Sequence, residues 1–327
     1  MKRSIVAALA LCALLGLATG ADAQAVRPET APSAPRAIWT WEGPSFAMLE
    51  SAQVAGEALD FLHDHRVGIV YLYADAFDGR NPVERKPQLY RDFIRAAHAR
   101  GIQVYALLGS WYLHTERYVL PRHQRKAVAM LQRVLDYNAA AAPGERFDGV
   151  NYDIEPHLLD EWEDATRPRL LLGFLDMTAA MMEARRKSGQ TLPIGPAMPF
   201  WWDGIELEWR GVRKPVSEHV IDITDYVALM DYRNHADGGD GILSHAEDEM
   251  DYASRVGKRV AIGLEFNPGE PEKLSFHGMD EAAFEREADA VEAAWGKRLA
   301  FAGFVFHHYE GYRRFVGQPV PAAESTP

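Results

Sequence analysis

Three polar side chains alternate along one short segment of the chain. The segment 147–156 reads FDGVNYDIEP, so single residues separate Asn151, Asp153 and Glu155. In a β-strand, residues with this spacing point to the same face, and buried carboxyls are costly unless they are used. Two neighbouring acids also disturb each other's ionisation, so that one holds its proton more tightly. The spacing therefore indicates an acid–base pair, with Glu155 as proton donor and Asp153 as its partner.

Eight short apolar segments alternate with stretches of helical periodicity. The apolar segments are rich in Val, Ile, Tyr and Phe, which is typical of parallel strands that are buried on both faces. This alternation predicts a single (β/α)8 TIM barrel over residues 37–316. An open doubly wound sheet would need a glycine-rich phosphate loop after its first strand, and WTWEGP at 39–44 is not one. The expected strands are 37–41, 67–74, 102–108, 149–154, 192–198, 226–230, 260–266 and 302–306, and the expected helices include 46–65, 88–100, 124–141, 170–187 and 281–295.

Active sites of this barrel lie at the carboxyl ends of the strands, so the polar and aromatic residues there form the candidate site. Aromatic rings stack on the apolar faces of pyranoses, and carboxylates bind hydroxyls and move protons. The combination therefore favours a carbohydrate cleft, although any one of these rings could instead pack the core or the rim. The candidate substrate-binding residues are Asn151, Trp41, Asp75, Trp111, Trp201, Trp202, Arg233, Glu265 and His307.

Two motifs resemble those of a known family. The run DGVNYDIE at 148–155 resembles the D-G-x-D-x-D-x-E signature of family 18 glycoside hydrolases, the chitinase-like barrels. The run MDYR at 230–233 is similar to the M-x-Y-D motif of that family. Asn151 and Arg233 stand where the family usually has Asp, and His307 stands near the end of the eighth strand, where it usually has Trp. The resemblance covers the barrel as an ordered set of strands, with specific motifs on two of them.

The resemblance implies hydrolysis of a glycosidic bond with retention and with assistance from the substrate. Glu155 would protonate the glycosidic oxygen, and the 2-acetamido oxygen of the substrate would attack the anomeric carbon. Asp153, as an anion, would orient that acetamido group and stabilise the charged intermediate, and Tyr232 would hydrogen-bond the group. Glu155 would then act as base toward water. The implied partner is a polysaccharide or oligosaccharide, and no cofactor is implied.

Arg233 brings a cation to a position where the family has an anion. Its guanidinium could bind an anionic substituent of the substrate in a bidentate manner. Alternatively, it could form a salt bridge to Asp231, Asp75 or Glu265. Plain chitin is therefore not a safe inference, and we expect an extracellular or envelope polysaccharide.

Two other functions stay open. Glu155 and Glu265, at the ends of the fourth and seventh strands, resemble the acid/base and nucleophile of the large retaining glycosidase clan on this barrel, a mechanism that needs carboxyls about 5–5.5 Å apart. That clan has Asn before its acid, where Ile154 stands here. A lectin-like barrel that binds glycans without cleaving them is the other possibility, because fold does not fix function.

A metal centre is not expected. The sequence has no H-x-x-x-H or H-E-x-x-H spacing on a predicted helix. The adjacent His307 and His308 would point to opposite faces of a strand.

The first residues have the pattern of a secretory signal peptide. Lys2 and Arg3 precede an apolar run at 5–17, and ADA precedes Gln24, which predicts a signal peptide over 1–23. The run is too short for a comfortable membrane span. We therefore expect an exported protein, periplasmic or extracellular, that does not cross a membrane.

Composition limits the remaining possibilities. The 327 residues include 47 acidic and 35 basic side chains, for a net charge of −12. This acidic balance speaks against nucleic acid as a partner. Residues 24–36 are expected to be a linker and 317–327 a flexible tail. The single cysteine, Cys12, lies inside the predicted signal peptide, so burial of the core must stabilise the mature protein.

Overall fold

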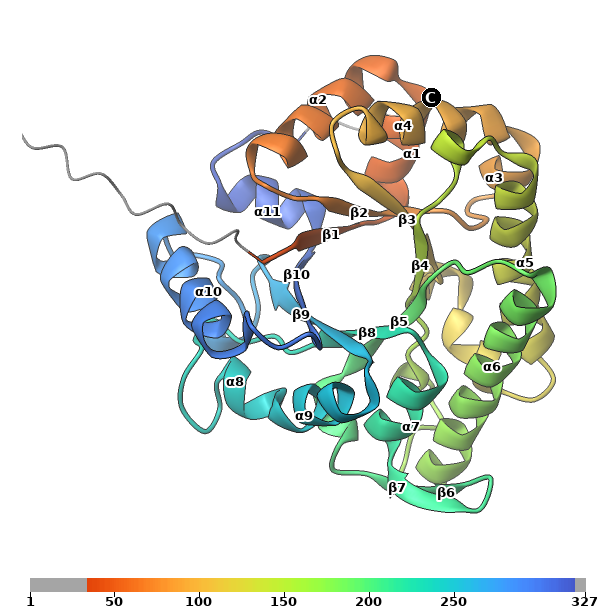
Figure 1. Ribbon diagram of the computed structural model, residues 1–327, viewed down its shortest axis with the longest axis vertical. Helices are drawn as coiled ribbons and strands as arrows, with labels where there is room; N and C mark the ends of the chain where they lie inside the picture. The colour runs from red at the N-terminus through yellow and green to blue at the C-terminus, as the bar shows by residue number, and fades with distance from the viewer. Residues whose placement is uncertain (1–33, 321–327) are drawn as a thin grey trace, which may run out of the picture. The chain divides into compact units, whose positions relative to one another are not determined.

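Eight parallel strands close into a barrel in the computed structural model, which describes residues 34–320. The strands follow the order β1-β10-β9-β8-β5-β4-β3-β2, and helices surround them (Figure 1). This architecture confirms the predicted (β/α)8 barrel. The predicted signal peptide lies outside the described residues, as do most of the linker and the tail. The barrel strands are β1 Arg36–Thr40, β2 Ile69–Tyr73, β3 Gln103–Leu108, β4 Gly149–Tyr152, β5 Ile194–Pro199, β8 Tyr226–Met230, β9 Arg259–Glu265 and β10 Phe301–His307.

The helices follow the predicted alternation with one clear difference. The stretch 46–65, expected as one helix, forms two, because Ser51 begins the second helix and its hydroxyl accepts a hydrogen bond from Val54 N at 3.3 Å. The helices are α1 Glu42–Glu50, α2 Ala52–Asp64, α3 Pro82–Arg85, α4 Pro87–His98, α5 Gln124–Ala140, α6 Arg167–Ser188, α7 Val216–Ile223, α8 Ile242–His245, α9 Glu247–Val256, α10 Glu281–Trp295 and α11 Tyr309–Phe315.

Large aromatic side chains fill the interior of the barrel. The ring of Tyr71 lies 5.8 Å from that of Trp39 and 5.5 Å from that of Tyr105, and Tyr105 in turn contacts Tyr226. A Cβ atom at Gly149, the first residue of β4, would lie 2.3 Å from the Tyr105 ring. The start of β4 therefore needs glycine, because the tyrosine occupies the space that a side chain would need.

One hairpin was not predicted. Strands β6 Glu206–Trp209 and β7 Val212–Pro215 pair antiparallel between β5 and α7 and stand apart from the barrel sheet. Its turn, at Arg210 and Gly211, has positive φ at both residues, as a two-residue hairpin turn requires.

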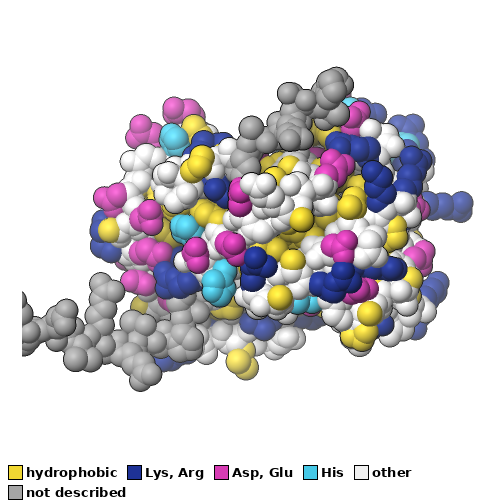
Figure 2. All heavy atoms as spheres, turned by 90° about the horizontal axis from the view of Figure 1, so that it is seen from above, with side chains coloured by type: hydrophobic (Ala, Val, Ile, Leu, Met, Phe, Trp, Pro, Cys, Tyr) yellow, Lys and Arg dark blue, Asp and Glu magenta, His cyan; other side chains and the backbone are white. Residues whose placement is uncertain are grey.

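The surface of the described domain is mixed in charge. Acidic and basic side chains are interspersed over the face drawn in Figure 2. Within residues 34–320, no helix combines the length and the apolar character that a membrane span requires.

Candidate active site

The acid pair lies where β3 and β4 end. The Asp153 backbone continues the β4 ladder, since its N–H donates to Leu108 O at 2.8 Å. The next residue of the neighbouring strand, Gly109, has φ +98°, and a Cβ there would lie 2.2 Å from Asp153 O. Glycine therefore allows the two chains to approach at the point where the acids emerge.

Asp153 lies in surroundings that disfavour its charged form. Its Oδ1 atom is buried and has no hydrogen-bond partner within the described residues. Burial raises the pKa of Asp153 well above its usual value, and the nearby carboxyls of Glu155 and Glu42 raise it further. These surroundings favour the protonated form of Asp153.

Glu42 belongs to this cluster, although the sequence did not single it out as a candidate. It begins α1 directly after β1, is buried, and accepts a hydrogen bond from the hydroxyl of Ser110. The sequence feature that could have indicated this role is the position of a carboxylate just after the first strand. Its negative charge acts on Asp153 and strengthens the preference for a proton there.

Glu155 is partly exposed and has a histidine beside it. Its side chain is 20% exposed, and its Oε2 lies 3.0 Å from His157 Nε2. The ring of His157 packs edge-on against Trp162 and Trp201. This partner was also missed, and the spacing Glu-Pro-His was its only signal in the sequence.

Tyr232 follows β8 and faces the same group of acids. Burial raises the pKa of Tyr232 well above its usual value, and the charges of Glu265, Glu155 and Asp153 raise it further. The phenol therefore keeps its proton and can donate a hydrogen bond into the site.

Glu265 and His307 form a tightly bonded pair at the ends of β9 and β10. Glu265 Oε1 accepts hydrogen bonds from Phe266 N, Asn267 N and Asn267 Nδ2, at 2.6–2.8 Å. Its Oε2 lies 2.6 Å from His307 Nδ1. Burial opposes ionisation of Glu265, but His307 and Asn267 outweigh it and hold the pKa below its usual value. Glu265 is therefore an anion that fixes the imidazole of His307.

The ring of His307 is surrounded by predicted site residues and by the barrel interior. Tyr232 lies 5.6 Å from it, Trp41 lies 6.1 Å and Trp39 lies 5.8 Å, between ring centroids. The structure thus brings Trp41, Tyr232, Glu265 and His307 together at the carboxyl ends of β1, β8, β9 and β10.

Arg233 pairs with a residue that was not among its expected partners. Its Nε and Nη2 atoms lie 3.1 and 2.9 Å from Asp240 Oδ1, and its Nη1 donates to Tyr232 O at 2.8 Å. The expected bridges to Asp231, Asp75 or Glu265 were therefore wrong in their partner. Asp240 is only seven residues further along the chain, in the loop after β8, so the path of that loop, which the sequence pattern does not give, decides the pairing.

Three predicted substrate-binding residues are buried in the structure. Asn151 accepts from Trp39 Nε1 at 2.9 Å and donates to Gly195 O at 3.1 Å, so it cross-links the barrel interior. Asp75 is 2% exposed and pairs with Arg133 of α5. Trp202 is fully buried against Phe174. In this structure none of the three offers its side chain to a substrate, because packing or pairing already occupies it.

Two other predicted tryptophans remain accessible. Trp111 is 64% exposed and its neighbour Tyr112 is 67% exposed, just after β3. Trp201 is 36% exposed just after β5. Exposed rings beside strand ends are suited to stacking on sugars.

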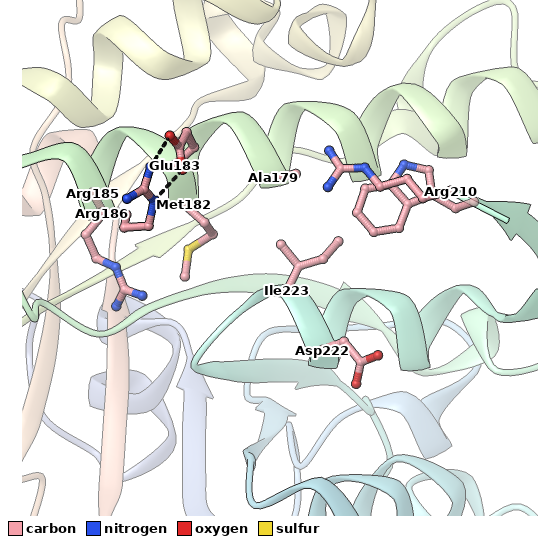
Figure 3. A pocket seen from close by; sticks show the side chains of 9 residues that line it. Ala179, Met182, Glu183, Arg185, Arg186, Arg210, Asp222 and Ile223 are labelled. Atoms are coloured by element: carbon pink, nitrogen blue, oxygen red, sulfur yellow. Dashed lines mark hydrogen bonds and ion pairs between the residues drawn. The ribbon is translucent and has the colours of Figure 1, made fainter. Parts of the chain in front are cut away.

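A separate hollow of about 680 Å³ lies between α6, α7 and the hairpin (Figure 3). Two of the arginines that line it already have carboxylate partners. Arg186 pairs with Glu183, and Arg185 pairs with Asp225. No residue of the acid pair lines it. Within residues 34–320, no group of three or more His, Cys, Asp or Glu side chains is arranged to hold a metal ion.

Comparison by sequence finds no family model and no curated protein that matches the chain. Comparison by structure finds similar solved structures, several of which are glycosidases. The C-terminal domain of a candidate chitinase from Desulfitobacterium hafniense superimposes with a TM-score of 0.55 and 12% identity, over 87% of this chain and 97% of that one. A family 18 chitinase of Cycas revoluta, a mutant solved with (GlcNAc)4, gives 0.50 and 14%, over 85% and 96%.

A third neighbour has another activity. The exo-β-1,4-mannosidase Op5Man5 of an Opitutaceae bacterium gives a TM-score of 0.53 and 15% identity, over 84% of this chain and 52% of that one. The resemblance to chitinase-like proteins seen in the two motifs thus extends to the fold. At these identities the likeness establishes the barrel, and the argument for function rests on the residues of the site.

Proposed function

We propose that this protein is a chitinase-like glycoside hydrolase that cleaves a polysaccharide or oligosaccharide with retention. The observation that carries the proposal is the acid pair after β4. Burial raises the pKa of Asp153 well above its usual value, whereas Glu155 is partly exposed. Two carboxyls in such different surroundings can take different roles in one reaction.

In the proposed reaction, Glu155 protonates the glycosidic oxygen as that bond breaks. The acetamido oxygen of the substrate attacks the anomeric carbon on the opposite face, so no protein nucleophile is needed. Asp153 orients the acetamido group, and the Tyr232 hydroxyl donates a hydrogen bond to it. Glu155, now a carboxylate, takes a proton from the water that opens the intermediate.

The bonding of Glu265 favours this route over a covalent glycosyl intermediate. Three donors already occupy its Oε1 and His307 holds its Oε2. A carboxylate fixed in this way is better suited to anchoring His307 beside the substrate than to attacking it. We therefore assign Glu265 and His307 to substrate binding.

The substrate we propose is an extracellular or envelope polysaccharide that contains 2-acetamido sugars. The pattern of the first residues supports export. A structural neighbour from Cycas revoluta was solved with (GlcNAc)4, an oligomer of such sugars. The exposed Trp111 and Trp201 would stack on sugar rings on the two sides of the acid pair.

The test is release of reducing ends from polysaccharides with and without N-acetyl groups. The mature protein, Glu155→Gln and the matched control Glu161→Gln would be compared, since Glu161 is an exposed acid in the loop after the site. Cleavage confined to 2-acetamido sugars, reduced at least about 10²-fold in Glu155→Gln and unchanged in Glu161→Gln, is the expected result.

The other possible outcomes of this test would favour different functions. Cleavage of sugars that lack the acetamido group would shift the nucleophile to Glu265. Binding without any cleavage across the panel would contradict the hydrolase and favour a lectin-like barrel.

A further inference from the structure

The imidazole of His307 is held at one nitrogen and open at the other. Its Nδ1 atom forms a hydrogen bond of 2.6 Å with Glu265 Oε2. Its Nε2 atom has no hydrogen bond within residues 34–320, and it is not one of the buried unpaired atoms there. The side chain as a whole is 25% exposed. One polar atom of the ring is therefore free to meet a ligand.

The carboxylate that holds this ring is itself fixed. Three donors, Phe266 N, Asn267 N and Asn267 Nδ2, bond to Glu265 Oε1 at 2.6–2.8 Å. Oε2 is therefore the oxygen that is left for His307. Because both oxygens are engaged, the direction of the imidazole is set before any ligand binds.

The ionisation of Glu265 decides which ring nitrogen carries hydrogen. His307 and Asn267 hold the pKa of Glu265 below its usual value, so the carboxyl is ionised and brings no hydrogen to the contact. The hydrogen of this bond must then belong to His307 Nδ1, whether the ring is neutral or charged. Nε2 carries a lone pair in the neutral ring and a hydrogen in the charged ring. A sugar hydroxyl can bond to both forms, since it donates as well as accepts.

Neighbouring rings leave no open face for a sugar to stack on. Between ring centroids, His307 lies 5.6 Å from Tyr232, 5.8 Å from Trp39 and 6.1 Å from Trp41. The ring of His308 lies 5.1 Å away on another side. A pyranose needs a whole aromatic face, whereas three quarters of this side chain is covered. The substrate can therefore meet His307 at its polar edge and not at a face.

Tyr232 connects this edge with the acid pair. Its ring neighbours that of His307, and its phenol feels the charges of Glu155 and Asp153 as well as that of Glu265. A sugar bound at the acid pair thus lies within reach of His307.

We infer that His307 Nε2 recognises a hydroxyl group of the sugar bound at the acid pair, and that Glu265 is the positioning residue that aims it. The inference rests on the proposed function and names a specificity contact within that site. A single directed hydrogen bond requires a hydroxyl at one place on the sugar, whereas a stacking ring accepts any apolar face.

The first test reads the tautomer and needs no activity. In the ¹⁵N-histidine-labelled full chain, the ring signals of His307 are assigned by their loss in His307→Gln and recorded at a pH where they no longer change. Hydrogen on Nδ1 with Nε2 bare is the expected result. Hydrogen on Nε2 in the wild type would overturn the inference.

The Glu265→Gln variant should reverse that tautomer. The three donors keep the amide oxygen at the position of Oε1, so the amide nitrogen faces His307 Nδ1. Nδ1 must then accept, and the hydrogen of the neutral ring is expected on Nε2. An unchanged tautomer in Glu265→Gln would show that Glu265 does not orient the ring.

The second test measures recognition of the sugar. The probes are (GlcNAc)4 and whichever polysaccharide the reducing-end assay finds to be cleaved. His307→Asn keeps an amide N–H near the position of Nδ1 but has no atom at that of Nε2, whereas His307→Gln restores a polar atom there. We expect His307→Asn to raise Kd and KM about 10-fold with kcat largely kept. His307→Gln is expected to recover most of the affinity.

A histidine–carboxylate pair at the other end of β4 supplies the control. His98 Nε2 lies 2.8 Å from Asp148 Oδ2, just before that strand begins. His98→Asn is expected to leave Kd and KM unchanged.

The outcomes separate this inference from the proposed function. If a sugar is cleaved and His307→Asn binds it as the wild type does, the hydroxyl contact is wrong and the hydrolase stands. Equal losses in His307→Asn and His307→Gln would show that the ring acts by packing and would also overturn the contact. If no sugar binds, the proposed function fails and the contact fails with it, while the tautomers still decide the role of Glu265.

Discussion

At the scale of single residues, the acid pair shows how environment separates two chemically similar groups. Asp153 has a buried, unpaired oxygen and two carboxyl neighbours, all of which favour its protonated form. Glu155, two residues further along, has partial access to solvent and a histidine partner. Only Ile154 separates these two acids along the chain.

The Asp153→Asn variant tests how burial of this carboxyl affects the stability of the folded protein. An acid whose pKa is raised by folding stabilises the fold below its unfolded pKa of about 3.9, and that contribution is lost as the pH rises toward the folded value. We therefore expect Asp153→Asn to gain stability relative to wild type between pH 5 and pH 8. Activity should fall at least about 10²-fold, because the orienting group is lost.

The measurement is thermal unfolding at pH 5 and pH 8, together with the rate of hydrolysis. Asp160→Asn, an exposed residue of the following loop, serves as the control and should change neither. A variant that is less stable than wild type at both pH values would show that the Asp153 carboxyl supports the fold.

At the scale of elements, short turns after the strands decide which side chains reach the site. Gly109 allows the end of β3 to approach the Asp153 backbone. Pro156 begins the turn that returns His157 to Glu155. Because these turns are short, they fix the direction of the side chains that follow each strand.

The close approach inside the barrel predicts a sensitive glycine. Gly149→Ala would place a methyl group 2.3 Å from the Tyr105 ring, which is itself held between Tyr71 and Tyr226. Overpacking of this kind costs about 1–3 kcal/mol. We expect a lower free energy of unfolding in urea for Gly149→Ala.

Gly144→Ala is the matched control, since a Cβ at that position would meet no atom within 4 Å. It should leave the urea midpoint close to that of the wild type. Equal urea midpoints for Gly149→Ala and Gly144→Ala would contradict this prediction. They would show that side chains in the barrel interior shift to accommodate the added methyl group.

At the scale of the whole molecule, folding buries acids far from the proposed site as well. Glu249 of α9 is 1% exposed. Burial, and then the charge of Asp203, raise its pKa to about 9. Between the unfolded value of about 4.3 and this folded value, the unfolded chain has released the proton that the folded protein still holds. The contribution of Glu249 to stability is therefore complete at low pH and is lost as the pH rises through this window.

Glu249→Gln should remove this dependence. We expect the variant to be close to wild type at pH 5 and more stable at pH 8, by up to roughly 1.4 kcal/mol for each pH unit between them. Urea unfolding at the two pH values measures the difference. Glu247→Gln, an exposed neighbour on the same helix, should show no such trend; if it did, the effect would come from net charge.

Closure of the barrel also completes the site from distant parts of the chain. Glu265 and His307 are 42 residues apart and bond at 2.6 Å, and Trp39 and Asn151 are 112 apart and bond at 2.9 Å. The order of strands and helices could be predicted, because each strand and helix carries its own periodicity. The buried position of Asn151 could not, since strand alternation places it on the interior face without giving its depth.

The sequence by itself determined the alternation of strands and helices and the placing of Asn151, Asp153 and Glu155 at the end of the fourth strand, because both follow from the pattern of a few adjacent residues. Tertiary structure alone decided that Arg233 pairs with Asp240, that Trp202 packs in the core and that Glu42 reaches the acid pair. Such partners depend on which strands and loops meet when the barrel closes, and burial then sets where each proton resides.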